Sequence, residues 1–181
     1  MLVYKRHLVT AALPYANGPL HIGHLSGAYL SSDVFVRFMR LMDKDVVFIC
    51  GSDEHGAAIT MRALKEQKSP KEIIDKYHQL FIKTFQGIGI SFDHYARTSD
   101  LLHHETSQDF FRNLYSAGEF DEIETEQYYD TIHNQFLADR YIVGTCPKCG
   151  NESAYGDQCE NCGTSLSPTE LISPKSVLSG E

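Results

Sequence analysis

Hydrophobic positions along this chain predict strands and helices that alternate over its first part. Apolar, β-branched runs at residues 7–12 and 45–50 predict strands. The second run is nearly continuous, which predicts a strand buried on both faces, as in a parallel sheet. Between the two runs, apolar residues recur at helical spacing and predict a helix over residues 21–42.

Three further helices are predicted downstream, over residues 56–68, 69–87 and 100–117. The second begins at Ser-Pro-Lys-Glu, where Ser69 can cap the helix and Glu72 can close a capping box. Strands that alternate with helices are typical of a doubly wound parallel sheet, so we expect an α/β fold.

The pattern changes near Gly118. Beyond this residue the long helices stop, apolar and polar residues alternate, and turn-forming residues gather around cysteines. We therefore predict two domains: an α/β domain over residues 1–117 and a smaller one over residues 118–181.

The composition and charge are those of a globular protein. Of the 181 residues, 42% are hydrophobic and 22% are charged, and the formal net charge is −8. This balance argues against a module that coats nucleic acid with basic side chains. Residues 113–139 contain seven acidic side chains and neither Lys nor Arg, so the rest of the chain is nearly neutral and stays compatible with RNA docking. We expect the acidic run at 119–130 to be a solvated face.

The sequence predicts neither a membrane partner nor a secreted protein. No apolar run reaches the roughly 18 residues that a membrane span requires, and residues 1–6 contain no signal-peptide core. Four of the five cysteines form two C-x-x-C pairs, which indicates metal binding in a reducing compartment. We expect a cytoplasmic protein.

The two cysteine pairs predict a metal site. Cys146 and Cys149 precede one glycine, Cys159 and Cys162 precede another, and nine residues separate the pairs. Each glycine permits a turn with positive φ, so that backbone N–H groups can point at sulfur. Four thiolates select Zn²⁺, with iron as the rarer choice, and leave no position for substrate. We predict one structural zinc per chain, because two matched pairs argue against a redox dithiol.

The start of the first predicted helix is a candidate nucleotide site. His21 and His24 lie on one helical face directly after a strand and a tight loop, with Gly23 between them. A helix N-terminus offers free N–H groups to phosphate, and the glycine lets a flat ring approach the backbone. These features suit a nucleoside triphosphate that is attacked at its α-phosphate while pyrophosphate leaves. A metal-binding pair, or a helix that happens to begin with histidine, would show the same spacing.

The residues around these histidines carry a family resemblance. Residues 11–24, A-A-L-P-Y-A-N-G-P-L-H-I-G-H, resemble the HIGH motif region of class I aminoacyl-tRNA synthetases, and their lead-in is similar to the methionyl branch. Residues 51–56, G-S-D-E-H-G, are similar to the next block of that family. The resemblance implies the first half of a doubly wound, Rossmann-like catalytic fold, followed by a connective-peptide insertion that carries the zinc knuckle.

The resemblance also implies roles for individual residues at the ATP site. His21 and His24 would contact the phosphates of ATP, which enters with Mg²⁺ as substrate, and would serve as catalytic residues. Gly23 would lie under the adenine ring.

A methionine site is implied by the same resemblance. Leu13, through its backbone, and Tyr15 would line this site, and Asp53 would accept from the methionine ammonium group. A carboxylate at the carboxyl end of a strand is a natural partner for an ammonium, although Asp53 could instead cap the next helix. The sequence leaves the roles of Glu54 and His55 open, and shaping of the loop is the simplest one.

Two features of the family are missing from these residues. The chain has no K-M-S-K-S string and no Trp, both of which the resemblance places in a second half of the site. We therefore expect the N-terminal portion of a longer enzyme that activates methionine and transfers it to tRNA(Met), and little activity from this portion alone. Two rival interpretations are a class I synthetase for Leu, Ile or Val, and a non-catalytic zinc-ribbon module that binds RNA or nucleotide.

Overall fold

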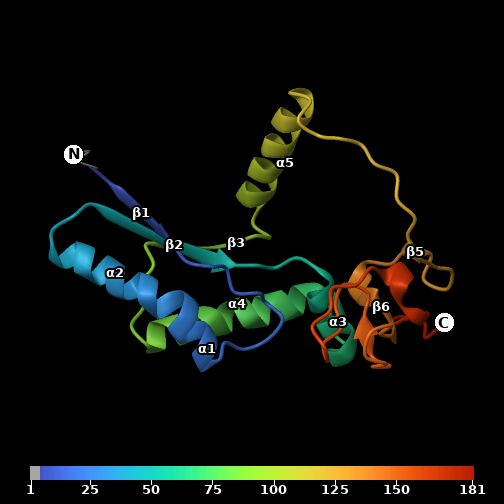
Figure 1. The fold of residues 1–181 in the computed structure, drawn as a ribbon. Helices are drawn as coiled ribbons and strands as arrows, with labels where there is room; N and C mark the ends of the chain where they lie inside the picture. The colour runs from blue at the N-terminus through green and yellow to red at the C-terminus, as the bar shows by residue number, and fades with distance from the viewer. Residues whose placement is uncertain (1–4) are drawn as a thin grey trace. The chain divides into compact units, whose positions relative to one another are not determined.

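The computed structural model describes residues 5–181, which form two compact units. The first unit extends to Phe120, and the second runs from Asp121 to Glu181 (Figure 1). The sequence had suggested a division between residues 117 and 118. None of the helices in the described range is both long and apolar enough to cross a lipid bilayer.

A three-stranded parallel sheet forms the centre of the first unit, which confirms the predicted α/β fold. Its strands lie in the order β1 (His7–Thr10), β2 (Val46–Ser52) and β3 (His94–Arg97). The register pairs Thr10 with Ile49, and Ser52 with Arg97. The sequence analysis missed β3. This strand has only four residues, and two of them, His94 and Arg97, are polar and mask the hydrophobic pattern of a strand.

Helical segments connect these strands. They are α1 (Ile22–His24), a π-helical turn (Leu25–Tyr29), α2 (Leu30–Leu41), α3 (Ala57–Glu66), α4 (Pro70–Gly87) and α5 (Leu101–Ser116). The single helix expected over residues 21–42 is therefore a continuous helical run that widens for one turn, where the N–H of Leu30 donates to the carbonyl of Leu25. The capping box of α4 is confirmed: the Ser69 hydroxyl accepts from the Glu72 N–H, and the Glu72 carboxylate accepts from the Ser69 N–H.

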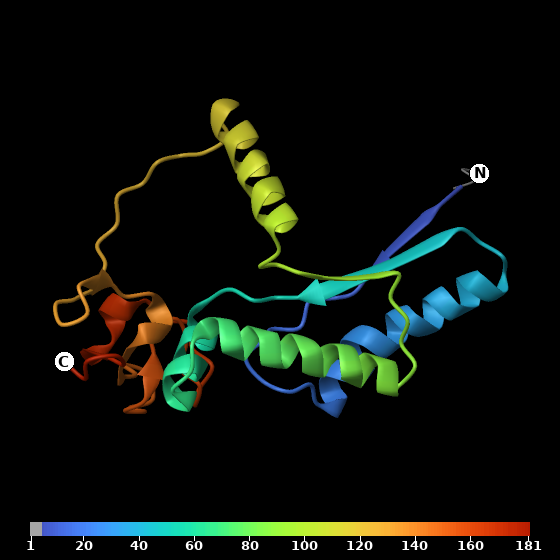
Figure 2. The same cartoon turned by 180° about the vertical axis from the view of Figure 1, so that it is seen from behind.

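The core of the first unit lies between the helices and one face of the sheet. Helices α2 and α4 lie on the same face in both views (Figure 1 and Figure 2). Phe48 of β2, Val36 of α2 and Phe81 of α4 are fully buried there. On the opposite face Leu8 is 65% exposed and Val47 is only partly buried. The prediction that β2 is buried on both faces is therefore wrong within residues 5–181, because α2 and α4 both cover the same face.

The second unit is built from short antiparallel strands. They are β4 (Tyr129–Asp130), β5 (Gln135–Phe136), β6 (Ile142–Thr145), β7 (Ala154–Tyr155) and β8 (Ile172–Ser176), with two 3₁₀ turns at Asp139–Tyr141 and Pro168–Glu170. The strands form a β4–β5 hairpin and a sheet of order β7-β6-β8. Its core is small and consists of Leu137, Ile142, Cys146, Ala154, Cys159 and Leu171.

One acidic residue of the second unit departs from the predicted solvated face. Asp130 is buried, because β4 turns its side chain inward. Its carboxylate accepts from the Ser176 hydroxyl at 2.6 Å and from the N–H groups of Ile132 and His133 at 2.9 Å. The hydrogen bond from Ser176, followed by those from His133, holds the pKa of this carboxyl well below its usual range.

Truncation of single aromatic rings should distinguish the buried from the exposed side of the helices. Phe81→Ala should lower the free energy of unfolding of the first unit by about 3–5 kcal/mol, because the buried ring leaves a cavity. Phe38→Ala on α2 is the matched control, since this ring is 56% exposed, and its effect should stay within about 0.5 kcal/mol. Urea unfolding followed by far-UV circular dichroism measures both. Equal losses would contradict the packing of α4 against the sheet.

Candidate functional site

The loop after β1 runs beside the end of β2 and brings two predicted methionine-site residues together. Tyr15 and Asp53 face each other in a parallel bridge. The Asp53 N–H donates to the Pro14 carbonyl at 2.9 Å, and the Ala16 N–H donates to the Asp53 carbonyl at 2.8 Å. Because both strands end at this edge of the sheet, the pairing continues past them into the loops.

Asp53 does not cap a helix. The N-cap of α3 is Gly56, which has no side chain, so the alternative role considered for Asp53 does not apply. The Asp53 side chain is half-buried, and within residues 5–181 no hydrogen bond reaches its carboxylate.

A cavity lies along the same loop. Its volume is about 270 Å³, and its lining includes Leu13, Tyr15, His24 and Tyr29. Two predicted methionine-site residues and one predicted ATP-site residue therefore share this cavity, whereas His21, Gly23 and Asp53 lie outside its lining.

Gly56 explains how Tyr15 fits against the second loop. A Cβ at Gly56 would lie 2.5 Å from the Tyr15 hydroxyl oxygen, and its φ is +122°. Only glycine combines this conformation with this close approach.

The two histidines of the helix start form a reciprocal cap. His21 Nδ1 accepts from the N–H groups of Gly23 and His24, and His24 Nδ1 accepts from the His21 N–H. The two rings are stacked, with centroids 3.6 Å apart. The expectation that these N–H groups are free for phosphate is therefore wrong, because the N-cap histidine uses two of them itself.

This cap determines which ring nitrogen carries the proton. A neutral imidazole that accepts at Nδ1 must hold its proton on Nε2. His21 and His24 therefore each keep an Nε2–H group as donor. Gly23 also packs closely here: a Cβ at this position would lie 3.0 Å from Cε1 of the His21 ring, so the ring would have to move by a few tenths of an ångström.

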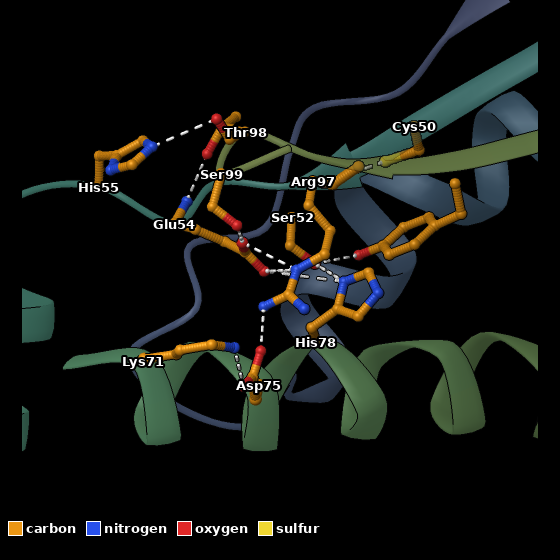
Figure 3. Close-up of polar contacts among 12 residues, drawn as sticks. Cys50, Ser52, Glu54, His55, Lys71, Asp75, His78, Arg97, Thr98 and Ser99 are labelled. Carbon is orange, nitrogen blue, oxygen red and sulfur yellow. Dashed lines mark hydrogen bonds and ion pairs between the residues drawn. The ribbon is translucent and has the colours of Figure 1, made fainter. Parts of the chain in front are cut away.

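A buried polar cluster, here named the Glu54 cluster, surrounds the side chain of Glu54, the residue after Asp53 (Figure 3). It consists of Ser52, Glu54, Asp75, His78, Arg97, Thr98 and Ser99. Arg97 Nε donates to both oxygens of the Glu54 carboxylate, at 2.8 and 2.9 Å, and the Ser99 hydroxyl donates to one of them. Arg97 Nη2 donates to Asp75 of α4 at 2.6 Å. Glu54 is therefore the centre of a network, rather than only a loop-shaping residue.

His78 is the neutral member of this cluster. Its Nδ1 lies 2.9 Å from the Ser52 hydroxyl, which also contacts the Tyr95 hydroxyl at 3.2 Å. Burial, and then the charge of Arg97, lower the pKa of His78, so the ring is uncharged at neutral pH. The sequence analysis singled out none of Asp75, His78, Arg97, Thr98 and Ser99, because no motif or local period links them to Glu54.

The four cysteines of the second unit converge as predicted. Their sulfurs all lie within 4.8 Å of one another, with Cys146 to Cys162 at 3.9 Å and Cys149 to Cys159 at 3.6 Å. Thiolates about 2.3 Å from one tetrahedral ion lie about 3.8 Å apart, so the cluster can hold a metal ion.

Hydrogen bonds favour the thiolate form of Cys159. The side-chain amides of Asn151 and Asn161 donate to the sulfurs of Cys159 and Cys149. The backbone N–H of Cys162 is the largest influence that lowers the pKa of Cys159, to about 6. The glycine after each pair adopts the expected positive φ, +73° and +69°.

Comparisons with known proteins agree with these features. The family model for tRNA synthetases class I (M) matches residues 7–181. Methionine–tRNA ligase from Flavobacterium psychrophilum is 60% identical over 98% of this chain and 26% of that protein. The ligase from Bacteroides fragilis is 61% identical over the same shares. The chain thus spans about a quarter of the length of these curated relatives.

A solved structure is similar as well. Mycobacterium tuberculosis methionyl-tRNA synthetase bound by methionyl-adenylate has a TM-score of 0.63 and 26% identity, and the match covers 84% of this chain and 31% of that one.

The tautomer of the paired histidines is directly measurable. At about pH 8, where imidazoles are neutral, ¹⁵N spectra of the side chains should show the proton of both His21 and His24 on Nε2. The reason is that both Nδ1 atoms accept backbone N–H groups. A proton on Nδ1 of either ring would contradict the reciprocal cap.

Proposed function

The chain belongs to the class I (M) family of tRNA synthetases, and from this premise we propose that it activates methionine with ATP and transfers it to tRNA(Met). It does so as part of a longer polypeptide, of the length of its relatives. This polypeptide is called the full-length enzyme below, and it is a ligase. One observation carries the proposal. Tyr15 and Asp53 face each other at the carboxyl edge of the sheet, in a fold similar to one bound by methionyl-adenylate.

The methionine ammonium group pairs with Asp53. The half-buried carboxylate has no hydrogen-bond partner among residues 5–181, so its acceptor capacity suits a ligand cation. Leu13 and Tyr15 line the cavity along the loop after β1. Together these residues hold the amino acid on the side of the sheet edge where the loop after β1 passes β2.

The phosphates of ATP take hydrogen bonds from His21 and His24. Each neutral ring offers one Nε2–H, and the stacked arrangement holds both rings at the helix start. Such donors stabilise charge that develops on the α-phosphate as pyrophosphate leaves, and neither histidine acts as a nucleophile. Gly23 presents no side chain to the adenine, and Mg²⁺ accompanies ATP as part of the substrate.

The cysteine cluster holds one structural Zn²⁺. Four thiolates in a tetrahedral arrangement favour this ion, and they leave no open position for chemistry. Metal binding here supplies local folding energy to a unit with a small core. Cysteines kept as thiolates fit a reducing compartment, so we place the protein in the cytoplasm.

The rival interpretations have less support. A non-catalytic zinc-ribbon module would leave residues 11–24 without a role. A synthetase for Leu, Ile or Val is not favoured either, because the matching family model is the methionine one and the relatives are methionine–tRNA ligases.

Loss of the ammonium partner should disable methionine activation. In the full-length enzyme, Asp53→Ala should lower kcat/KM for methionine by roughly two to four orders of magnitude, because one partner of a desolvated pair costs about 3–5 kcal/mol. The matched control is Asp45→Ala, which removes an exposed carboxylate paired with Arg6 before β2.

Methionine-dependent ATP–pyrophosphate exchange is the measurement for this substitution. The 181-residue chain by itself should give only background exchange, because it lacks K-M-S-K-S. An unchanged rate at low methionine in Asp53→Ala would rule out the ammonium contact. Robust exchange by the chain alone would contradict the need for a second half.

Metal content tests the second unit. Protein purified without chelator should contain one zinc per chain, and Cys159→Ser should lose it and loosen residues near 140–170, while the first unit stays folded. Cys50→Ser is the matched control, since Cys50 is a buried cysteine of the first unit, and it should retain the metal. Elemental analysis and hydrogen exchange measure both effects. Metal-free wild-type protein would refute the site.

A further inference from the structure

Residues 52–54 follow the alternation of an extended chain. Ser52 is fully buried and Glu54 is 3% exposed, whereas Asp53 between them is only partly buried. In extended backbone, successive side chains point to opposite sides. The burial of Ser52 and Glu54 therefore directs the Asp53 carboxylate to the outer side of the sheet edge.

Residues 97–99 hold this segment from the side of β3. Thr98 accepts from the Glu54 N–H at 2.8 Å through its hydroxyl, and its own N–H donates to the Ser52 carbonyl at 3.1 Å. Arg97 and Ser99 donate to the Glu54 carboxylate. Glu54 is thus bound to all three residues and Ser52 to Thr98, and Figure 3 shows how these side chains converge.

Asp53 itself is held from the other side by the loop after β1. Its N–H and carbonyl are bonded to Pro14 and Ala16, on either side of Tyr15. The position of its carboxylate relative to Tyr15 therefore depends on two sets of contacts, one from residues 14–16 and one from residues 97–99.

The ion pair between Glu54 and Arg97 can be broken by removing one charge, without removing a backbone contact. The Glu54 side chain has no exposed surface, and Arg97 is the cation that contacts it. Without that cation, an unpaired carboxylate would be buried, which is costly enough to draw Glu54 toward water. Since Asp53 and Glu54 share a peptide unit, an outward rotation of the Glu54 backbone turns the Asp53 side chain away from its position.

We propose that Glu54 and Arg97 are positioning residues that hold Asp53 in register with Tyr15 and so set the affinity for the ammonium group of the amino acid. Helix α4 contributes through Asp75, whose carboxylate accepts a hydrogen bond from Nη2 of Arg97. The inference rests on the proposed role of Asp53 as the ammonium partner.

Kinetics of the full-length enzyme test the effect on the amino-acid site. Arg97→Gln should raise KM for methionine about tenfold with kcat nearly unchanged, because the ammonium contact is the same in the substrate and transition states. Glu54→Gln should have a smaller effect, since Arg97 keeps Asp75. The double variant Glu54→Gln/Arg97→Gln should return KM to within about threefold of wild type, because no unpaired buried charge remains.

Hydrogen exchange in this chain tests the positioning without any ligand. The amides of Ala16 and Asp53 make the cross-loop bonds, and they should exchange about tenfold faster in Arg97→Gln. The Ala11 amide, which donates to the Ile49 carbonyl, reports on the sheet and should be unchanged. Arg62→Gln is the matched control, because Arg62 pairs with Glu66 on the surface of α3, and it should alter none of these amides.

The outcomes separate this proposal from the proposed function. Equally faster amide exchange of Ala16, Asp53 and Ala11 in Arg97→Gln would mean that the ion pair only stabilises the fold, which overturns the proposal. Unchanged exchange of Ala16 and Asp53 would overturn it as well. So would additive effects of the two substitutions on KM in the double variant. If Asp53→Ala leaves methionine activation unchanged, the assigned role of Asp53 fails, while the exchange rates still decide whether Glu54 and Arg97 position it.

Discussion

Parallel pairing of β2 with both of its neighbours is the constraint on which the rest of the first unit depends. Three parallel strands end at one edge, so residues that follow β1, β2 and β3 meet there although they are far apart in sequence. The loop at 11–20 meets residues 52–56, and residues 97–99 close the group from the other side. Helices α2 and α4 cover one face of the sheet.

The two units differ in how much apolar side chain they bury. The first buries large aromatic side chains such as Phe48, Phe81 and Phe85 between sheet and helices. The second has few buried apolar residues, two of which are cysteines of the metal cluster. A metal ion held by these cysteines would supply folding energy that so small a core does not.

Polar groups find their partners in different ways at the start of the first helix and in the Glu54 cluster. The exposed histidines of the helix start satisfy each other through backbone N–H groups and keep one donor each. The charges in and beside the Glu54 cluster alternate in sign from the buried end to the surface. They belong to Glu54, Arg97, Asp75 and Lys71, in that order. Each of these charges therefore has an opposite neighbour at hydrogen-bond distance.

The sequence by itself determined what depends on near neighbours in the chain. The capping box at Ser69, the cysteine spacing around residues 146–162 and the residue string at 11–24 are local patterns, and each predicted its element or site. Only the tertiary structure decided that Glu54 lies against Arg97, that Tyr15 faces Asp53, and that β3 joins the sheet. These contacts join residues about forty positions apart, and local periodicity carries no information about a partner at that distance. The capping of the helix start by His21 was also decided by structure, because backbone geometry determines whether an N-cap side chain takes the free N–H groups or leaves them to a ligand.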